Sequence, residues 1–194
     1  MCSGLIHPPI VKTTRWNDEA ATRQFAIHMA ARLVTSLADQ PSSSSVYLAL
    51  QGDLGAGKTT LVRHLLRSLG VSGRIKSPTY AVLESYELPM FTPSCTFWHF
   101  DFYRFDSPHE WADAGFRDIF AGQGIKLAEW PEKVAGCVPQ ADLVIQITAT
   151  PDEIRHIVLT AHSPLGAYLL DEQADCLTVP EMPMPAHVVT DVSA

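Results

Sequence analysis

Residues 52–59 read Gly52-Asp53-Leu54-Gly55-Ala56-Gly57-Lys58-Thr59, and no other stretch says as much about the fold. They fit the phosphate-binding pattern G-x-x-x-x-G-K-[ST], known as the P-loop. Glycines let such a loop curl, so that its N–H groups point inward at an anion. In this pattern the lysine reaches the β- and γ-phosphates of a nucleotide, and the threonine hydroxyl holds Mg²⁺. We therefore expect a nucleoside triphosphate site here.

The flanks of this motif predict a strand before it and a helix after it. Residues 46–51 are a short apolar run with β-forming side chains. The leucines that follow recur at helical spacing, at Leu61, Leu65, Leu66 and Leu69. The loop would then lie between a strand and a helix N-terminus, whose dipole attracts phosphate. The alternative is a glycine turn with a surface lysine.

Composition excludes several classes of protein. The chain has 194 residues, of which 46% are hydrophobic, enough for one well-cored domain. Its net charge of −7 argues against a protein that holds nucleic acid by itself through a broad basic surface. The 4 cysteines form no C-x-x-C pair, so they suggest neither a zinc site nor a disulfide framework. With no long apolar run and no signal pattern, we expect a cytoplasmic protein.

The remaining patterns outline one α/β domain over residues 17–170. We expect residues 1–16 to be irregular and residues 171–194 to be a Pro-rich, poorly ordered tail. Asn17 is a plausible N-cap for the first helix. Helices are predicted at 18–37, 59–69 and 108–115, and further strands at 81–88, 95–105, 124–128, 143–148 and 154–160. The strands at 81–88 and 95–105 read as an antiparallel hairpin.

Asp101 is the first candidate for completing a nucleotide site. It lies in the aromatic run His99-Phe100-Asp101-Phe102-Tyr103-Arg104, where a charge is costly unless it is paired or binds a cation. His99 and Asp101 share one face of the predicted strand. We place Asp101 near the metal; the alternatives are an ion pair with Arg104 or a structural hydrogen bond. His99 alone reads as a strand histidine with satisfied hydrogen bonds rather than a metal ligand.

Two further segments carry candidate groups. Glu129 ends the predicted strand at 124–128, and catalytic groups of open α/β sheets lie at the carboxyl ends of strands. Trp130 follows Glu129. A tryptophan here would shape the site, or it would belong to the core or to an interface. In Ser77-Pro78-Thr79 a hydroxyl facing the loop would contact the γ-phosphate, as switch loops do, although a plain Ser-Pro turn explains the same residues.

Four motifs occur in order along the chain: GDLGAGKTT, SPTY, HFDFYR and EWPEK. Together they resemble the TsaE family, formerly called YjeE, over residues 17–160. These are bacterial P-loop ATPases required for making threonylcarbamoyladenosine in tRNA. In this family the TsaD–TsaB complex transfers the threonylcarbamoyl group to the adenosine next to the anticodon. TsaE binds that complex, and its ATP hydrolysis supports repeated turnover.

The resemblance implies an ATP site made from named residues. Residues 52–60, which include Thr60, would cradle the phosphates. Thr59 and Glu129 would coordinate Mg²⁺, and Asp101 would act at the metal or on the attacking water.

The same resemblance assigns the remaining site residues, the partners and the fold. Thr79 would be the switch-like catalytic residue, and Trp130 would lie close to the nucleotide or the partner surface. The partners would be the TsaD and TsaB proteins, with tRNA reached only through their complex and no membrane involved. The implied fold is a P-loop NTPase fold, with a single mixed sheet of a parallel core plus an antiparallel hairpin, flanked by helices.

The sequence alone also allows other activities. No arginine finger is evident: Arg63 and Arg67 lie on the predicted P-loop helix, and Arg104 or Arg117 would approach only if the fold allows. Hydrolysis should therefore be slow without partners. The alternative enzyme is a small-metabolite or nucleoside kinase, although no arginine cluster suggests a lid. A third reading is a binding module in which ATP drives assembly rather than chemistry.

Overall fold

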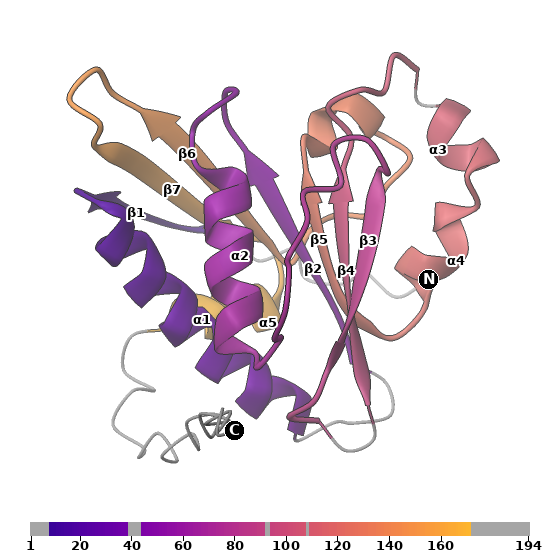
Figure 1. The fold of residues 1–194 in the computed structure, drawn as a ribbon, viewed down its shortest axis with the longest axis horizontal. Coiled ribbons are helices and arrows are strands. Elements are labelled where there is room, and N and C mark those ends of the chain that lie inside the picture. Colours follow the sequence, from indigo (N-terminus) through magenta and orange to yellow (C-terminus); the bar gives the residue numbers. More distant parts are fainter. Residues whose placement is uncertain (1–7, 39–43, 92–93, 108, 172–194) are drawn as a thin grey trace, which may run out of the picture.

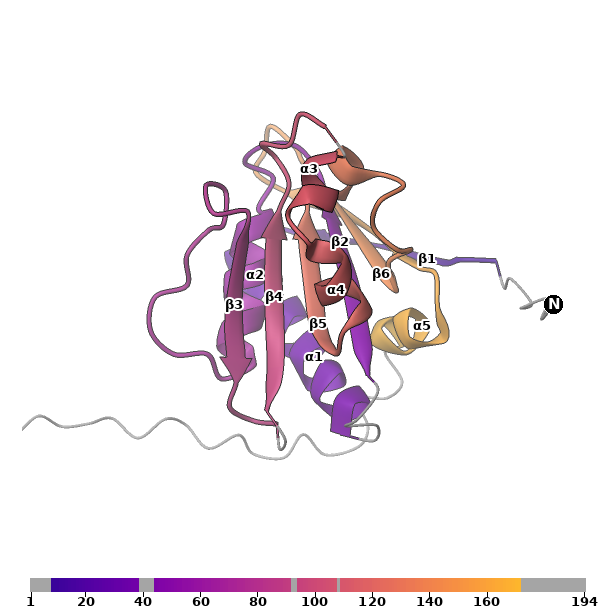
Figure 2. The same ribbon diagram turned by 90° about the vertical axis from the view of Figure 1, so that its right-hand side faces the viewer.

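Residues 8–38, 44–91, 94–107 and 109–171 are described by a computed structural model. Over these residues one sheet of seven strands is covered by helices on both faces, which makes three layers (Figures 1 and 2). The predicted fold class is therefore confirmed. The predicted tail, residues 171–194, lies outside the described residues after position 171.

The sheet has a parallel centre and antiparallel edges. Its strands are β1 (Ile10–Trp16), β2 (Ser45–Gln51), β3 (Leu83–Leu88), β4 (Cys95–Asp101), β5 (Gly124–Glu129), β6 (Leu143–Ala149) and β7 (Arg155–Ala161). They lie in the order β1-β7-β6-β2-β5-β4-β3. The four strands β6, β2, β5 and β4 run parallel, while β3 pairs antiparallel with β4 and β7 with β6. The predicted β3–β4 hairpin is confirmed.

The helices divide between the two faces of the sheet. They are α1 (Glu19–Ala38), α2 (Lys58–Ser68), α3 (His109–Asp113), α4 (Phe116–Ala121), the 3₁₀ turn η1 (Pro131–Val134) and α5 (Pro164–Leu170). Figure 2 shows α3 and α4 in front of β4 and β5, with α1 and α2 behind the sheet. The carboxyl ends of the parallel strands, and the start of α2, lie at one common edge (Figure 1).

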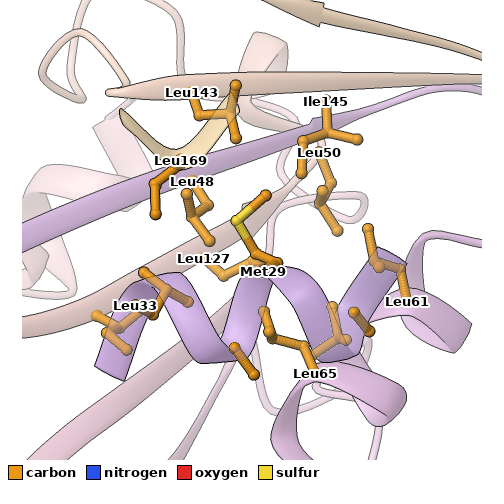
Figure 3. Packing of buried hydrophobic residues seen from close by; sticks show 14 of the residues in the cluster. Met29, Leu33, Leu48, Leu50, Leu61, Leu65, Leu127, Leu143, Ile145 and Leu169 are labelled. Carbon is orange, nitrogen blue, oxygen red and sulfur yellow. The ribbon is translucent and has the colours of Figure 1, made fainter. Parts of the chain in front are cut away.

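Two apolar clusters hold the layers together. Side chains of α1, α2, β2, β5, β6 and α5 meet in the larger one, where Figure 3 labels Met29, Leu33, Leu48, Leu50, Leu61, Leu65, Leu127, Leu143, Ile145 and Leu169. Alternation along β2 sends Leu48 and Leu50 to this cluster and Tyr47 and Ala49 to the other. Each fully buried leucine stabilises the fold by ~1.5–3 kcal/mol.

Aromatic side chains dominate the second cluster. Phe100 of β4 packs with ring centroids 5.2 Å from Phe116 and 5.0 Å from Phe120, both of α4. Trp111 of α3 lies on the same cluster. This cluster covers one face of β4, so the opposite face of the strand can present polar groups.

The N-terminal region differs from the prediction. Residues 10–16 form β1 rather than an irregular segment, because β7 supplies an antiparallel partner for every residue of that strand. The N-cap of α1 is Asp18 rather than Asn17, since the Asp18 carboxylate accepts a hydrogen bond from Ala21 N at 2.8 Å.

Later segments differ as well. The second strand of the hairpin ends at Asp101 rather than at residue 105. No sequence pattern predicted α4 and α5, because each is shorter than eight residues and too short for a clear 3.6-residue period. Within the described ranges no helix is both long and apolar enough to span a bilayer.

Lys126 is a buried cation in the middle of β5. Its side chain is fully buried, and its Nζ donates to Ser45 Oγ at 3.0 Å, to Gly124 O at 3.3 Å and to Gly122 O. Burial lowers the pKa of Lys126 to about 8. The folded chain thus releases this proton more readily than the unfolded chain.

We predict a pH-dependent stability that originates at Lys126. Between pH 8 and the pKa of ~10.4 expected in the unfolded chain, the unfolded state binds more protons, so the free energy of unfolding rises with pH, here by ~1–3 kcal/mol. Urea denaturation at pH 7.5 and 9.5 measures the rise. Lys126→Met should flatten it, and an equal rise in that variant would contradict the assignment.

A second prediction concerns the loop between β2 and α2. Gly52 has φ +135°, and a Cβ on it would lie 2.1 Å from the Ile147 carbonyl oxygen. Gly55 has φ +80°, but a Cβ there would meet no atom within 4 Å. Gly55→Ala should therefore lose only the ~1–2 kcal/mol of a left-handed residue, and Gly52→Ala considerably more. Equal losses in chemical denaturation would refute this difference.

Candidate functional site

The P-loop has the backbone of an anion site. Between β2 and α2 the chain turns through Gly52, Gly55 and Gly57, all with positive φ. Gly57 is the N-cap of α2 and provides no side chain for the first N–H groups of the helix. Such N–H groups, together with the helix dipole, favour an anion. The predicted strand–loop–helix unit is therefore present.

Lys58 is folded back onto the loop. Its Nζ donates to Gly52 O at 2.6 Å and to Asp53 O at 2.9 Å, and lies 3.9 Å from the centroid of the Trp130 ring. The side chain is 5% exposed. Burial lowers the pKa of Lys58, and the charge of Glu129 opposes that effect. An anion would replace neutral carbonyl acceptors with charged ones, which bind an ammonium more strongly.

Thr59 and Glu129 come together although 70 residues separate them. The Thr59 hydroxyl, at the start of α2, donates to Glu129 Oε1 at 2.9 Å and to Oε2 at 3.1 Å. The cause is the parallel pairing of β2 and β5, which sets Glu129 opposite Leu50 just before the loop. Glu129 is 2% exposed. A buried carboxylate therefore touches the predicted Mg²⁺-binding hydroxyl.

Asp101 lies beside Glu129 on the neighbouring strand, since the β4–β5 register pairs these two residues. Thr79 donates its hydroxyl to Asp101 Oδ2 at 2.7 Å, and Tyr103 N donates to Oδ1 at 3.0 Å. Arg104 instead lies with its guanidinium 4.2 Å from the Tyr80 ring. The structure thus brings together Asp101, Thr79 and Glu129, and the alternative ion pair of Asp101 with Arg104 is not the observed arrangement.

Backbone strain marks both segments that carry these groups. Trp130 follows Glu129 with φ 59°, and Val82 closes the Thr79 loop with φ 66°. Val82 N donates to Pro78 O at 2.6 Å, and Val82 O accepts from Asp101 N at 2.9 Å. Left-handed conformations cost ~1–2 kcal/mol for such residues, and strain of this kind clusters at functional sites.

The donor set fits Mg²⁺ shared with phosphates. Among the described residues, no group of three or more His, Cys, Asp and Glu side chains is placed to hold a metal on its own. Mg²⁺ commonly takes only one or two carboxylates and completes its octahedron with phosphate and water oxygens. The Thr59 hydroxyl and the carboxylates of Glu129 and Asp101 match that requirement.

Two residues have contacts at the site that the sequence did not predict. His99 contacts Glu129, with its Nε2 2.9 Å from Oε1. Arg155 of β7 donates from Nε to Ala56 O at 3.4 Å, inside the P-loop. The alternation along β4 placed His99 on the correct face. The prediction that its hydrogen bonds are satisfied holds for Nε2 only, since among the described residues buried Nδ1 has no partner. No local pattern links residues 99 positions apart, so the contact of Arg155 with the P-loop could be predicted only from the order of strands in the sheet.

A cavity of about 320 Å³ adjoins the P-loop. It lies between the start of α1, the loop and the β6–β7 turn, and its lining includes Asp18, Gly57, Thr60 and Arg155. Through Ala56, Gly57 and Thr60 the cavity borders both the loop and the first turn of α2. The P-loop therefore has a hollow beside it that Arg155 also borders.

Comparison with known proteins assigns the family. The family model of threonylcarbamoyl adenosine biosynthesis protein TsaE matches residues 16–157. The tRNA threonylcarbamoyladenosine biosynthesis protein TsaE of Haemophilus influenzae is 40% identical over 129 residues, 66% of this chain and 78% of that protein. Its Bacillus subtilis namesake is 37% identical over 117 residues, 59% and 68% of the two chains.

A solved structure agrees with the sequence comparisons. The crystal structure of Bacillus subtilis YdiB superposes with a TM-score of 0.67 at 27% identity, covering 88% of this chain and 98% of that one. The family inferred from the four motifs is thereby confirmed, over nearly the same residues. The chain belongs to the TsaE family of threonylcarbamoyl adenosine biosynthesis proteins.

Proposed function

We propose that this chain is a Mg²⁺-dependent ATPase that binds the TsaD–TsaB complex in the cytoplasm. There it supports threonylcarbamoylation of the adenosine next to the anticodon in tRNA. The observation that carries the ATPase proposal is the contact of Thr59 with buried Glu129, with Asp101 alongside, at the mouth of the P-loop. Family membership supports the role in tRNA modification.

Binding of the phosphates is the task of the loop and Lys58. Residues 52–60 would surround the phosphates with N–H groups, and Lys58 would leave the carbonyls of Gly52 and Asp53 for phosphate oxygens. Movement of Lys58 also frees the face of Trp130. The cavity beside Thr60 and Arg155 would then hold the nucleoside.

Hydrolysis needs charge stabilisation and an oriented water molecule. Bound Mg²⁺ supplies charge neutralisation on the phosphates, and Thr59 and Glu129 would hold it. Asp101, fixed by Thr79 and by the backbone of Tyr103, would act at the metal or accept a hydrogen bond from the attacking water. Preorganised groups of this kind lower the barrier because they need no rearrangement during the reaction.

A kinase fits this structure less well. Nucleoside and metabolite kinases of the P-loop class close an arginine-bearing lid over the substrate. In this chain the segment that follows β4 packs its large side chains, Trp111, Phe116 and Phe120, into the sheet. A segment that forms a layer of the core is poorly suited to open and close.

The first prediction for this function concerns the site residues. Lys58→Ala and Glu129→Ala should each abolish ATP hydrolysis in a phosphate-release assay while circular dichroism shows a folded chain. Exposed Glu87 provides a control carboxylate, because it pairs with Thr96 at the amino end of β4, away from Asp101, and Glu87→Ala should retain most of the activity. Hydrolysis by the Glu129→Ala protein at the wild-type rate would remove Glu129 from the metal site.

The second prediction concerns partners. Arg104 stacks on Tyr80, and Arg67 binds the carbonyls of Val71 and Gly73 near the far end of α2. Arg155 does reach the P-loop, but its guanidinium donates to the carbonyls of Ala56 and Glu153. None of these three arginines is poised to stabilise a transferring phosphoryl group, so the isolated protein should hydrolyse ATP slowly. A partner that supplies such a group accelerates related enzymes by ~10³ or more.

Reconstituted tRNA modification tests this second prediction. TsaD–TsaB, tRNA and a threonylcarbamoyl donor should give multiple turnovers only when this protein and ATP are both present, and ATP hydrolysis should rise with them. A non-hydrolysable ATP analogue that sustains multiple turnovers would favour the pure binding module instead. Fast ATP hydrolysis by the purified protein alone would contradict the need for partners.

A further inference from the structure

His99 is a buried histidine that uses one of its two ring nitrogens. It lies on β4 two residues before Asp101, and its side chain is fully buried. Its Nε2 lies 2.9 Å from Oε1 of Glu129 on the adjacent strand. Within the described part of the chain, its buried Nδ1 meets no hydrogen-bonding group. Among the described residues, the one hydrogen-bonding partner of this ring is therefore Glu129.

The contact with Glu129 fixes the position of the ring proton. A carboxylate only accepts hydrogen bonds, so Nε2 carries the proton and donates it. Nδ1 then keeps a bare lone pair, whereas a proton on it would add a buried N–H without an acceptor. The geometry thus selects the neutral Nε2–H tautomer of His99.

This second hydrogen bond determines how the carboxylate is rotated. Thr59 reaches both oxygens of Glu129, at 2.9 and 3.1 Å, so its hydroxyl alone does not distinguish them. His99 comes from a different strand and holds Oε1 only. Two donors from β4 and α2 together leave the three torsions of the Glu129 side chain little freedom.

We propose that His99 is a positioning residue for the metal site. As the Nε2–H tautomer it fixes Oε1 of Glu129 and so holds the carboxylate in one orientation, in which it would bind Mg²⁺. This inference rests on the proposed function of Glu129 as a metal-holding residue. It extends that function, because the hydrogen bond of His99 goes to Glu129 and not to the nucleotide loop.

Filling the core does not account for an imidazole at this place. Leucine has a similar volume and would bury no bare nitrogen. The neighbouring residue on the same face of β4, Phe97, is such a filler and is fully buried in the larger apolar cluster. His99 differs from it in its hydrogen bond to Glu129.

The first test compares variants at position 99. His99→Leu removes the donor, while His99→Gln keeps an N–H at the same number of bonds from Cβ. Electron paramagnetic resonance measures Mn²⁺, in place of Mg²⁺, binding to the full chain loaded with the non-hydrolysable analogue AMP-PNP. Loss of a group that orients a metal ligand weakens metal binding by roughly 10–100-fold.

We expect that loss in His99→Leu, with the affinity for AMP-PNP in EDTA unchanged and with His99→Gln restored close to the wild type. In the ATPase assay, kcat should fall in His99→Leu and the Mg²⁺ concentration needed for half-maximal rate should rise. Phe97→Leu is the matched control, which should lose stability but keep wild-type Mn²⁺ binding. Wild-type Mn²⁺ binding by a folded His99→Leu protein would overturn the proposal.

The second test uses the wild-type chain without nucleotide or metal, so it does not depend on a variant that folds. ¹⁵N NMR of the His99 ring should show a protonated Nε2 and an unprotonated Nδ1. The opposite tautomer would overturn the proposal.

Failure of this inference and failure of the proposed function give different results. If Glu129→Ala leaves Mn²⁺ binding unchanged, the proposed metal site is wrong and the role of His99 falls with it. If Glu129→Ala abolishes Mn²⁺ binding and His99→Leu does not, only the positioning role is wrong.

Discussion

The hydrogen bond from Thr59 to Glu129 connects the two halves of the candidate site. It joins the first turn of α2 to the carboxyl end of β5, and it forms because β2 and β5 pair in parallel and end together. The same edge of the sheet receives Asp101 from β4, one strand further along. The site therefore depends on strand order, since inserting another strand between β2 and β5 would separate Glu129 from Thr59.

Burial gives this edge its electrostatic character. Glu129 and Asp101 lie side by side at 2% and 4% exposed, and the charge of buried Lys58 interacts with both. Two adjacent carboxylates repel each other where little water screens them, and the Lys58 ammonium donates only to neutral carbonyls of the loop. A divalent cation would offset the repulsion between the two carboxylates. A phosphate group bound with it would give Lys58 a charged acceptor in place of neutral carbonyls.

Much of this arrangement could be predicted from local sequence. The strand, glycine loop and helix around residues 46–69 have strong periodic and conformational signals, and alternation along β4 placed His99 and Asp101 on one face. Features set by distant contacts were not predictable. β1 owes its structure to pairing with β7, Arg155 reaches the loop only through the sheet order, and the partner of His99 depends on the β4–β5 register.

In the function proposed for this chain, the Thr59 hydroxyl, held by Glu129, helps to bind Mg²⁺ together with ATP phosphates. Thr59→Val removes the hydroxyl with almost no change of shape, so it isolates that contact. Isothermal titration calorimetry with AMP-PNP, with and without Mg²⁺, measures the gain in affinity that the ion provides. We predict that the wild-type chain shows a gain and Thr59→Val loses it while binding AMP-PNP in EDTA as before. An equal gain in both proteins would contradict the account.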